Sequence, residues 1–240
     1  MNKESKDVQN TYLVLTLLST FSTSFIYGIN TLFLLDAGLS ITEAFAANAF
    51  FTLGQVFFEI PTGIIADTVG RRTSYLLGII TLFLATLIYL FLWRISGPFW
   101  LWAVTSILLG LGFTFFSGAT EAWIVDALKF TNFNGELEDV FAKAQWVGGV
   151  AMLSGAIVGG ALAQIANLGV PYILRCIMLL AAFVYTYSKM HDLGYKSRKM
   201  EKLVPEVKVS FVNAVNFSFK NKALKYVIFS SLFTMSVMIY

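Results

Sequence analysis

Apolar stretches with few charges, long enough to cross a lipid bilayer, recur along the whole chain. They occupy residues 12–35, 44–66, 74–93, 98–127, 140–166 and 171–188, and another begins at residue 223. A helix needs about 20 mostly apolar residues to cross the hydrocarbon core. With 57% hydrophobic and 13% charged residues, the chain has far more apolar surface than a water-soluble core of this size can hide. The sequence therefore predicts an all-α protein that has the bilayer as its solvent.

The order of these stretches divides the chain into three parts. Residues 1–188 are predicted to form a bundle of six transmembrane helices, in which short connections make successive helices antiparallel. Residues 189–222 are polar and basic, which indicates a cytoplasmic linker. Residues 223–240 are interpreted as the truncated start of a seventh transmembrane helix, so we expect a further carboxy-terminal half.

The positions of the basic residues predict the orientation. If the amino terminus is cytoplasmic, all but two of the 17 Lys and Arg residues lie toward the cytoplasmic side, as the positive-inside rule requires. The exceptions are Arg94 and Arg175, and Arg175 is expected to extend its head group to the outer interface. We expect an integral protein of the plasma membrane, which is the inner membrane in a bacterium.

The turn between the second and third predicted helices carries the most specific pattern in the chain. It places Gly63, Asp67, Gly70, Arg71 and Arg72 in the run GIIADTVGRR. Gly63 would let a neighbouring helix approach closely, Gly70 would permit a tight turn, and Asp67 would cap a helix or pair with a basic group. A plain cytoplasmic turn explains the two arginines, but it does not explain an acid between two such glycines.

This pattern resembles the loop G-x-x-x-D-x-x-G-R-[KR] of the major facilitator superfamily at every defining position. The topology also resembles that family, in which six helices precede a long basic linker. The resemblance implies that the six helices form a 3+3 inverted repeat and that a second six-helix half is their partner. It also implies a latch in which Asp67 and Arg71 hold the two halves together in the outward-facing state. Asp126 is then a candidate acidic partner for Arg71.

Two acidic residues fall within apolar stretches, Glu59 in the second predicted helix and Glu121 in the fourth. A charge within the membrane costs at least about 2.5 kcal/mol, so such residues mark candidate functional sites. Burial of a carboxyl group favours its neutral form, which would let proton binding be coupled to conformation. Both residues are therefore candidates for proton coupling, and the alternative is that they only form hydrogen bonds with neighbouring helices.

Polar side chains form a stripe at helical spacing on the first and fourth predicted helices. Such spacing places them on one face of each helix. The resemblance makes these two helices equivalent members of the repeat, which line a central cavity. The alternative is that the Ser and Thr side chains only join neighbouring helices. The candidate cavity-lining residues are Thr16, Thr20, Thr23, Tyr27, Asn30, Ser106, Thr114 and Ser117.

The fifth predicted helix is rich in glycine, with Gly155 and Gly159 spaced for close helix packing. Its residues 151–160 resemble the antiporter motif G-x-x-x-G-P-x-x-G-G of the same family. Ala151 and Ala156 stand where that motif has glycine and proline, which weakens drug/proton antiport as an inference.

The chain offers few residues for other chemistry. Its single cysteine, Cys176, lies in an apolar stretch, so neither a disulfide framework nor a Cys/His metal cluster is expected. No nucleophile has a base partner, and therefore we expect neither an enzyme nor a cofactor, and no nucleic-acid partner.

The function predicted from the sequence is secondary active transport of a small solute by alternating access, coupled to protons and compatible with efflux. The alternative is a facilitative carrier, or a membrane sensor or scaffold on the same fold. Coupled transport requires titratable groups that face a cavity, so the positions of Glu59 and Glu121 distinguish these hypotheses.

Overall fold

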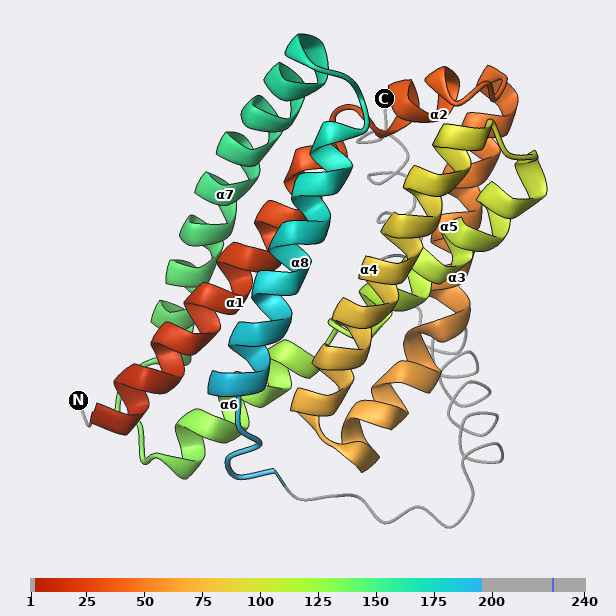
Figure 1. Cartoon of the computed structure of the whole chain (residues 1–240). Helices are drawn as coiled ribbons and strands as arrows, with labels where there is room; N and C mark the ends of the chain where they lie inside the picture. The colour runs from red at the N-terminus through yellow and green to blue at the C-terminus, as the bar shows by residue number, and fades with distance from the viewer. Residues whose placement is uncertain (1–2, 196–225, 227–240) are drawn as a thin grey trace. The chain divides into compact units, whose positions relative to one another are not determined.

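The computed structural model describes residues 3–195 and residue 226 (Figure 1). Residues 3–195 lie in the first of two compact units of the chain. The predicted linker beyond residue 195 and the predicted seventh helix, apart from residue 226, lie outside the described residues. The helices of the first unit are α1 (Lys3–Tyr27), α2 (Asn30–Asp36), α3 (Ile41–Val69), α4 (Arg71–Ile95), α5 (Phe99–Thr114), α6 (Ala119–Phe130), α7 (Leu137–Ile165) and α8 (Val170–Lys189).

The described helices provide up to six stretches that are long and apolar enough to cross a membrane. Helices α3, α4, α7 and α8 each qualify alone, and α5 and α6 qualify together. The sixth stretch is the pair α1 and α2, which is bent by 48°. These stretches match the six predicted helices in order. The prediction of an all-α membrane bundle is therefore confirmed, but the first and fourth predicted helices are each broken in two.

Local sequence explains where several helices begin. Ser40 and Glu43 form a capping box at the start of α3, in which each backbone N–H is bonded by the other residue's side chain. Pro98 directly precedes α5 and Pro171 lies in the first turn of α8. Proline suits a first turn because it has no N–H group to leave unpaired.

The helices pack mainly across the two halves of the predicted repeat. The most extensive contacts join α3 to α5, α1 to α7 and α8, and α4 to α5 and α8. Exchanging the first three spans with the last three replaces α1 by α5, α3 by α7 and α4 by α8. The contact between α3 and α5 then becomes the contact between α7 and α1, and the contact between α4 and α5 becomes the contact between α8 and α1. The α4–α8 contact maps onto itself. The packing therefore has the exchange symmetry of a 3+3 repeat.

Glycines permit the close approach of α1 and α7. A Cβ atom on Gly155 would overlap the hydroxyl of Ser24, and a Cβ atom on Gly159 would overlap the backbone carbonyl of Phe25. The predicted close packing through these two glycines is confirmed. The symmetry-related contact between α3 and α5 is equally close, because Gly54 of α3 faces the backbone of Ile107 of α5.

An aromatic core lies where α2 meets α4, α5 and α8. Phe33 of α2 is fully buried and stacks on Tyr172 of α8, with ring centroids 3.9 Å apart. The rings of Trp93 and Trp102 flank Phe33 as well. Helix α2 therefore ends the bent first span by inserting an aromatic side chain between three other helices.

Helix α6 lies at the opposite end of the bundle from α2 (Figure 1). Ser5 at the start of α1 donates a hydrogen bond of 3.2 Å to the carbonyl of Thr131, directly after α6. The indole of Trp123 in α6 donates one of 2.7 Å to the carbonyl of His191, just beyond α8. Helix α6 thus connects the beginning of the first span to the end of the sixth.

Candidate functional site

The fourth span is interrupted between α5 and α6, at residues 115–118. Gly118 has φ 66° and ψ −32°, a conformation that side-chain-bearing residues rarely adopt. The N–H of Ala119 bonds to the carbonyl of Ser117 at 2.7 Å, so the chain turns tightly before the next helix begins. The sequence predicted one continuous helix here; the span is present as Phe99–Phe130, but this turn divides it into α5 and α6.

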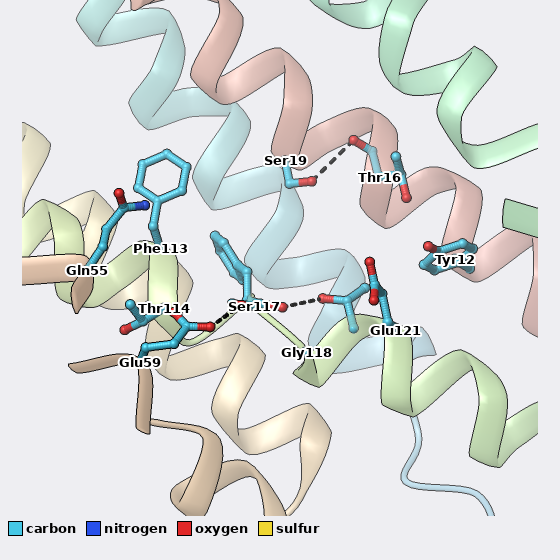
Figure 2. A pocket seen from close by; sticks show the side chains of 12 residues that line it. Tyr12, Thr16, Ser19, Gln55, Glu59, Phe113, Thr114, Ser117, Gly118 and Glu121 are labelled. Carbon is cyan, nitrogen blue, oxygen red and sulfur yellow. Dashed lines mark hydrogen bonds between the residues drawn. The ribbon is translucent and has the colours of Figure 1, made fainter. Parts of the chain in front are cut away.

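A cavity of about 490 Å³ lies beside this interruption. Figure 2 shows its lining side chains, which come from α1, α3, α5, α6 and the turn between α5 and α6. The residues that line it are Tyr12, Thr16, Ser19, Gln55, Glu59, Phe113, Thr114, Phe116, Ser117, Gly118, Thr120 and Glu121. Both predicted proton-coupling candidates therefore face the same cavity.

Glu59 connects α3 to the interruption. The hydroxyl of Ser117 donates a hydrogen bond of 2.5 Å to Oε1 of Glu59, as Figure 2 shows. One turn further along α3, the hydroxyl of Thr62 lies 3.1 Å from the carbonyl of Thr114, the last residue of α5. Two side-chain bonds from α3 therefore hold the end of α5 and the turn that follows it.

Glu121 lies in the first turn of α6, and its side chain enters the cavity near Tyr12 of α1 (Figure 2). The partial positive charge of a helix amino terminus stabilises a carboxylate at this position. The sequence analysis expected Glu59 and Glu121 to be enclosed by neighbouring helices, but both are exposed. The interruption of the fourth span explains the difference, because it leaves both carboxyl groups facing an open cavity.

The predicted stripe on the first span divides into different environments. Thr16 lines the cavity, while Thr20 lies against Gly148 of α7, within 3.7 Å of where a Cβ atom would be. Thr23 bonds to the carbonyl of Ser19 in its own helix. Of these three threonines, the structure brings only Thr16 to the cavity.

The last two members of this stripe lie at the bend between α1 and α2. Tyr27 is 66% exposed, so it is not enclosed by the described helices. The amide of Asn30 donates to Asn48 of α3 at 2.9 Å, and its oxygen accepts a bond of 2.8 Å from the hydroxyl of Tyr172 in α8. Asn30 therefore fixes the bend and does not line the cavity.

The stripe on the fourth span divides in the same way. Thr114 and Ser117 line the cavity. Ser106 is fully buried, and its hydroxyl lies 2.7 Å from the hydroxyl of Tyr89 in α4. Ser106 therefore packs against another helix, as the alternative interpretation expected.

The predicted latch loop joins α3 to α4 through a single residue. Gly70 has φ 116°, so only glycine suits this turn, and a Cβ atom there would lie 2.5 Å from Oδ2 of Asp192. Arg71 forms an ion pair of 2.5 Å with Asp67 one turn earlier. The expected partner Asp126 makes no ion pair with Arg71 within residues 3–195. Gly63 has open space beside it, so the close approach expected there is not made by the described residues.

Asp192 is the acid that the sequence analysis missed at this loop. Its Oδ1 accepts a hydrogen bond of 2.9 Å from the N–H of Arg72, at the amino terminus of α4. Arg72 in turn donates to the carbonyl of Tyr187 at 2.5 Å and lies over its ring. The hydroxyl of Tyr195 donates a hydrogen bond of 2.8 Å to the carbonyl of Asp67. The loop is therefore held by the segment that follows α8.

Arg175 does not extend to the interface as expected, because only 1% of it is exposed. Its Nε donates a bond of 3.1 Å to the hydroxyl of Thr86 in α4, and its guanidinium carbon lies 5.8 Å from the ring centroid of Phe113. The flanking helices α4 and α5 cover the side chain before it can reach either surface.

Seven of the residues that line the cavity escaped the sequence analysis, namely Tyr12, Ser19, Gln55, Phe113, Phe116, Gly118 and Thr120. Ser19 lies one helical turn from Thr16, and Gln55 lies one turn from Glu59. A search for polar residues one turn away from each predicted site residue would have found these two. As for metal sites, no group of three His, Cys, Asp or Glu residues in the described part of the chain is placed to hold an ion.

Broken spans around a polar, carboxyl-bearing cavity, with a charged loop at one end of the bundle, define a polytopic membrane protein of the transporter class of folds. The chain belongs to the Major Facilitator Superfamily, whose family model matches residues 12–240. It is also similar to an uncharacterized MFS-type transporter of Methanocaldococcus jannaschii, with 24% identity over 210 residues. That match covers 84% of this chain and 52% of the relative, so the chain spans about half the length of the curated relative.

Proposed function

We propose that this chain is the amino-terminal half of a secondary transporter that moves a small solute across the plasma membrane by alternating access, coupled to protons. The observation that carries the proposal is the joint presence of Glu59 and Glu121 in one polar cavity beside a broken span. A cavity of about 490 Å³ is of the size that holds a small organic molecule. The amino terminus lies in the cytoplasm in this proposal, and efflux is compatible with it.

The two carboxyl groups have different roles in the proposed cycle. Glu59 is bonded to Ser117, so loss or gain of its proton acts directly on the turn between α5 and α6. Glu121 has no such bond to the turn and stands on α6, which packs against α1. We assign Glu121 as the principal proton-binding group, and Glu59 as the group that transmits a change in charge to the broken span.

Alternating access requires that contacts within the bundle form and break without loss of the fold. The latch loop provides such a contact in the proposal, because the ion pair between Asp67 and Arg71 is partly exposed and is available to a second half. The close glycine contacts between α1 and α7 would remain intact through the cycle and keep the bundle rigid.

The test uses the full-length protein in proteoliposomes. Radiolabelled organic anions, organic cations and sugars are screened for accumulation driven by an imposed pH gradient. Glu121→Gln should abolish accumulation against a gradient while exchange between equal solute pools continues, because exchange need not cycle the proton. Glu138→Gln is the matched control, since Glu138 is an exposed acid in the first turn of α7, away from the cavity.

Each outcome separates the hypotheses. Transport with an unchanged pH response in both Glu121→Gln and Glu59→Gln would exclude these residues from coupling and favour a facilitative carrier. Absence of any flux, for every solute class and with the protein correctly inserted, would favour a sensor or scaffold.

A further inference from the structure

The most unusual charge in the described bundle is the guanidinium of Arg175, which the proposed coupling does not use. It is 1% exposed on α8, and within the described residues its Nη2 has no hydrogen-bond partner. Buried charges in membrane proteins are normally paired, so an unpaired donor of this kind marks a functional site. Its Nε, in contrast, donates a hydrogen bond to the hydroxyl of Thr86.

The surroundings of Arg175 contain hydroxyl groups and no carboxylate. The titratable groups that act on it electrostatically are Tyr172, Cys176 and Tyr89. Within residues 3–195 no acid lies at ion-pair distance from it. The positive charge is therefore not neutralised by the helices around it, although hydroxyl groups make the site polar enough to receive a charged group.

Phe113 is shared by this site and the cavity. Its ring lines the cavity, and Arg175 lies 5.8 Å from the centre of the same ring. A cation near an aromatic face at this distance is held by a weak attraction that an anion readily outcompetes.

We propose that Arg175 binds a carboxylate group of the transported solute, with Nη2 donating to a carboxylate oxygen once Phe113 has moved aside. This inference rests on the proposed transport function and names the class of solute, a small organic acid. Thr86 keeps the guanidinium oriented through Nε, so that Nη2 is the nitrogen left for the solute. The carboxylate supplies the negative charge that the bundle lacks at this position.

Three probes of the same shape and different charge test the proposal on the purified full-length protein in detergent. They are benzoate, benzamide and benzamidinium, and the shift in melting temperature with concentration gives an apparent Kd. Benzoate should bind, and Arg175→Met should weaken its binding by about tenfold or more, the loss expected for a charge-assisted hydrogen bond. Arg94→Met is the control, because Arg94 is an exposed arginine in the last turn of α4. Its benzoate affinity should not change.

Arg175→Met should still fold, because it removes a charge that has an unpaired nitrogen, and Arg175→Lys provides a second variant that keeps the charge. Lysine should restore part of the benzoate affinity. Equal benzoate affinity in the wild type and Arg175→Met would overturn the proposal. Stabilisation by benzamidinium or benzamide without benzoate would overturn it as well. Benzoate binding through Arg175 without uptake into proteoliposomes would instead refute transport and leave the carboxylate site standing.

Discussion

The hydroxyl of Ser117 lies 2.5 Å from Oε1 of Glu59, which joins the middle of α3 to the only residues of the fourth span that are not helical. The donor belongs to the turn between α5 and α6, and the acceptor belongs to α3, so this bond ties the turn to a neighbouring span. In the proposed cycle, a change in the charge of Glu59 would act on the turn through this bond.

A double-mutant cycle with Ser117→Ala and Glu59→Gln should reveal this coupling. We expect a pairwise interaction of about 1 kcal/mol, because the bond involves a charged acceptor but is open to solvent. The measurement is the unfolding free energy of the full-length protein in detergent. Additive effects of the two substitutions would show that the bond does not contribute.

Gly159 and Gly160 form a matched pair for testing the packing of α7 on α1. Gly159→Ala would push a methyl group against the carbonyl of Phe25, whereas no atom lies within 4 Å of a methyl group on residue 160. Gly159→Ala should therefore destabilise the protein by about 1–3 kcal/mol. Gly160→Ala should be neutral or stabilise it by up to about 1 kcal/mol, because alanine favours a helix. Melting temperatures check this pair, and similar values for both variants would contradict the close contact.

Two acids at the latch loop have different expected roles, one from the loop itself and one from the segment after α8. The ion pair of Asp67 with Arg71 is partly exposed, so Asp67→Asn or Arg71→Ala should change stability little while impairing transport. Asp192→Ala removes a bond at the amino terminus of α4 and should cost about 1 kcal/mol of stability. Melting temperatures and initial transport rates of the same samples distinguish them. Unaltered rates in both latch variants would remove Asp67 and Arg71 from the mechanism.

The orientation of the chain remains a prediction that labelling can check. A tag at Lys3 or Lys202 should be accessible only from the cytoplasm, and one at Ser96 only from the outside, since Ser96 lies in the exposed turn between α4 and α5. Accessibility of Ser96 and Lys202 from the same side would exclude the predicted topology, in which three spans separate them.

The helices were predictable from the sequence because the requirement for about 20 apolar residues acts on each segment separately. Pro98 and Pro171 indicated two helix starts for an equally local reason, because proline has no N–H group to leave unpaired in a first turn. The interruption at Gly118 was not predicted, because an apolar stretch lies on each side of it. Two signals were available: the Ser117-Gly118 pair is of a kind that marks turns, and residues 98–127 exceed what a straight span needs.

Contacts between distant parts of the chain were harder to predict from the sequence. Arg175 was expected at the interface because its position near the end of a helix is visible in the sequence, whereas its partners Thr86 and Phe113 come from two other helices. Asp192 was missed for the same reason, since its bond reaches back to Arg72, which lies 120 residues earlier in the chain. Polar residues at helical spacing located part of the cavity, but packing decided which of them face it.

The interlocking of the two repeats has a consequence for biogenesis. Nearly all extensive helix contacts join one of the first three spans to one of the last three, as with α1 and α7 or α3 and α5. The first three spans therefore have few partners among themselves, and the surfaces around Gly54 and Ser24 have no helix to pack on until α5 and α7 have been made. The contacts that close this bundle can form only once its later spans are present, so its assembly follows synthesis of the fifth span.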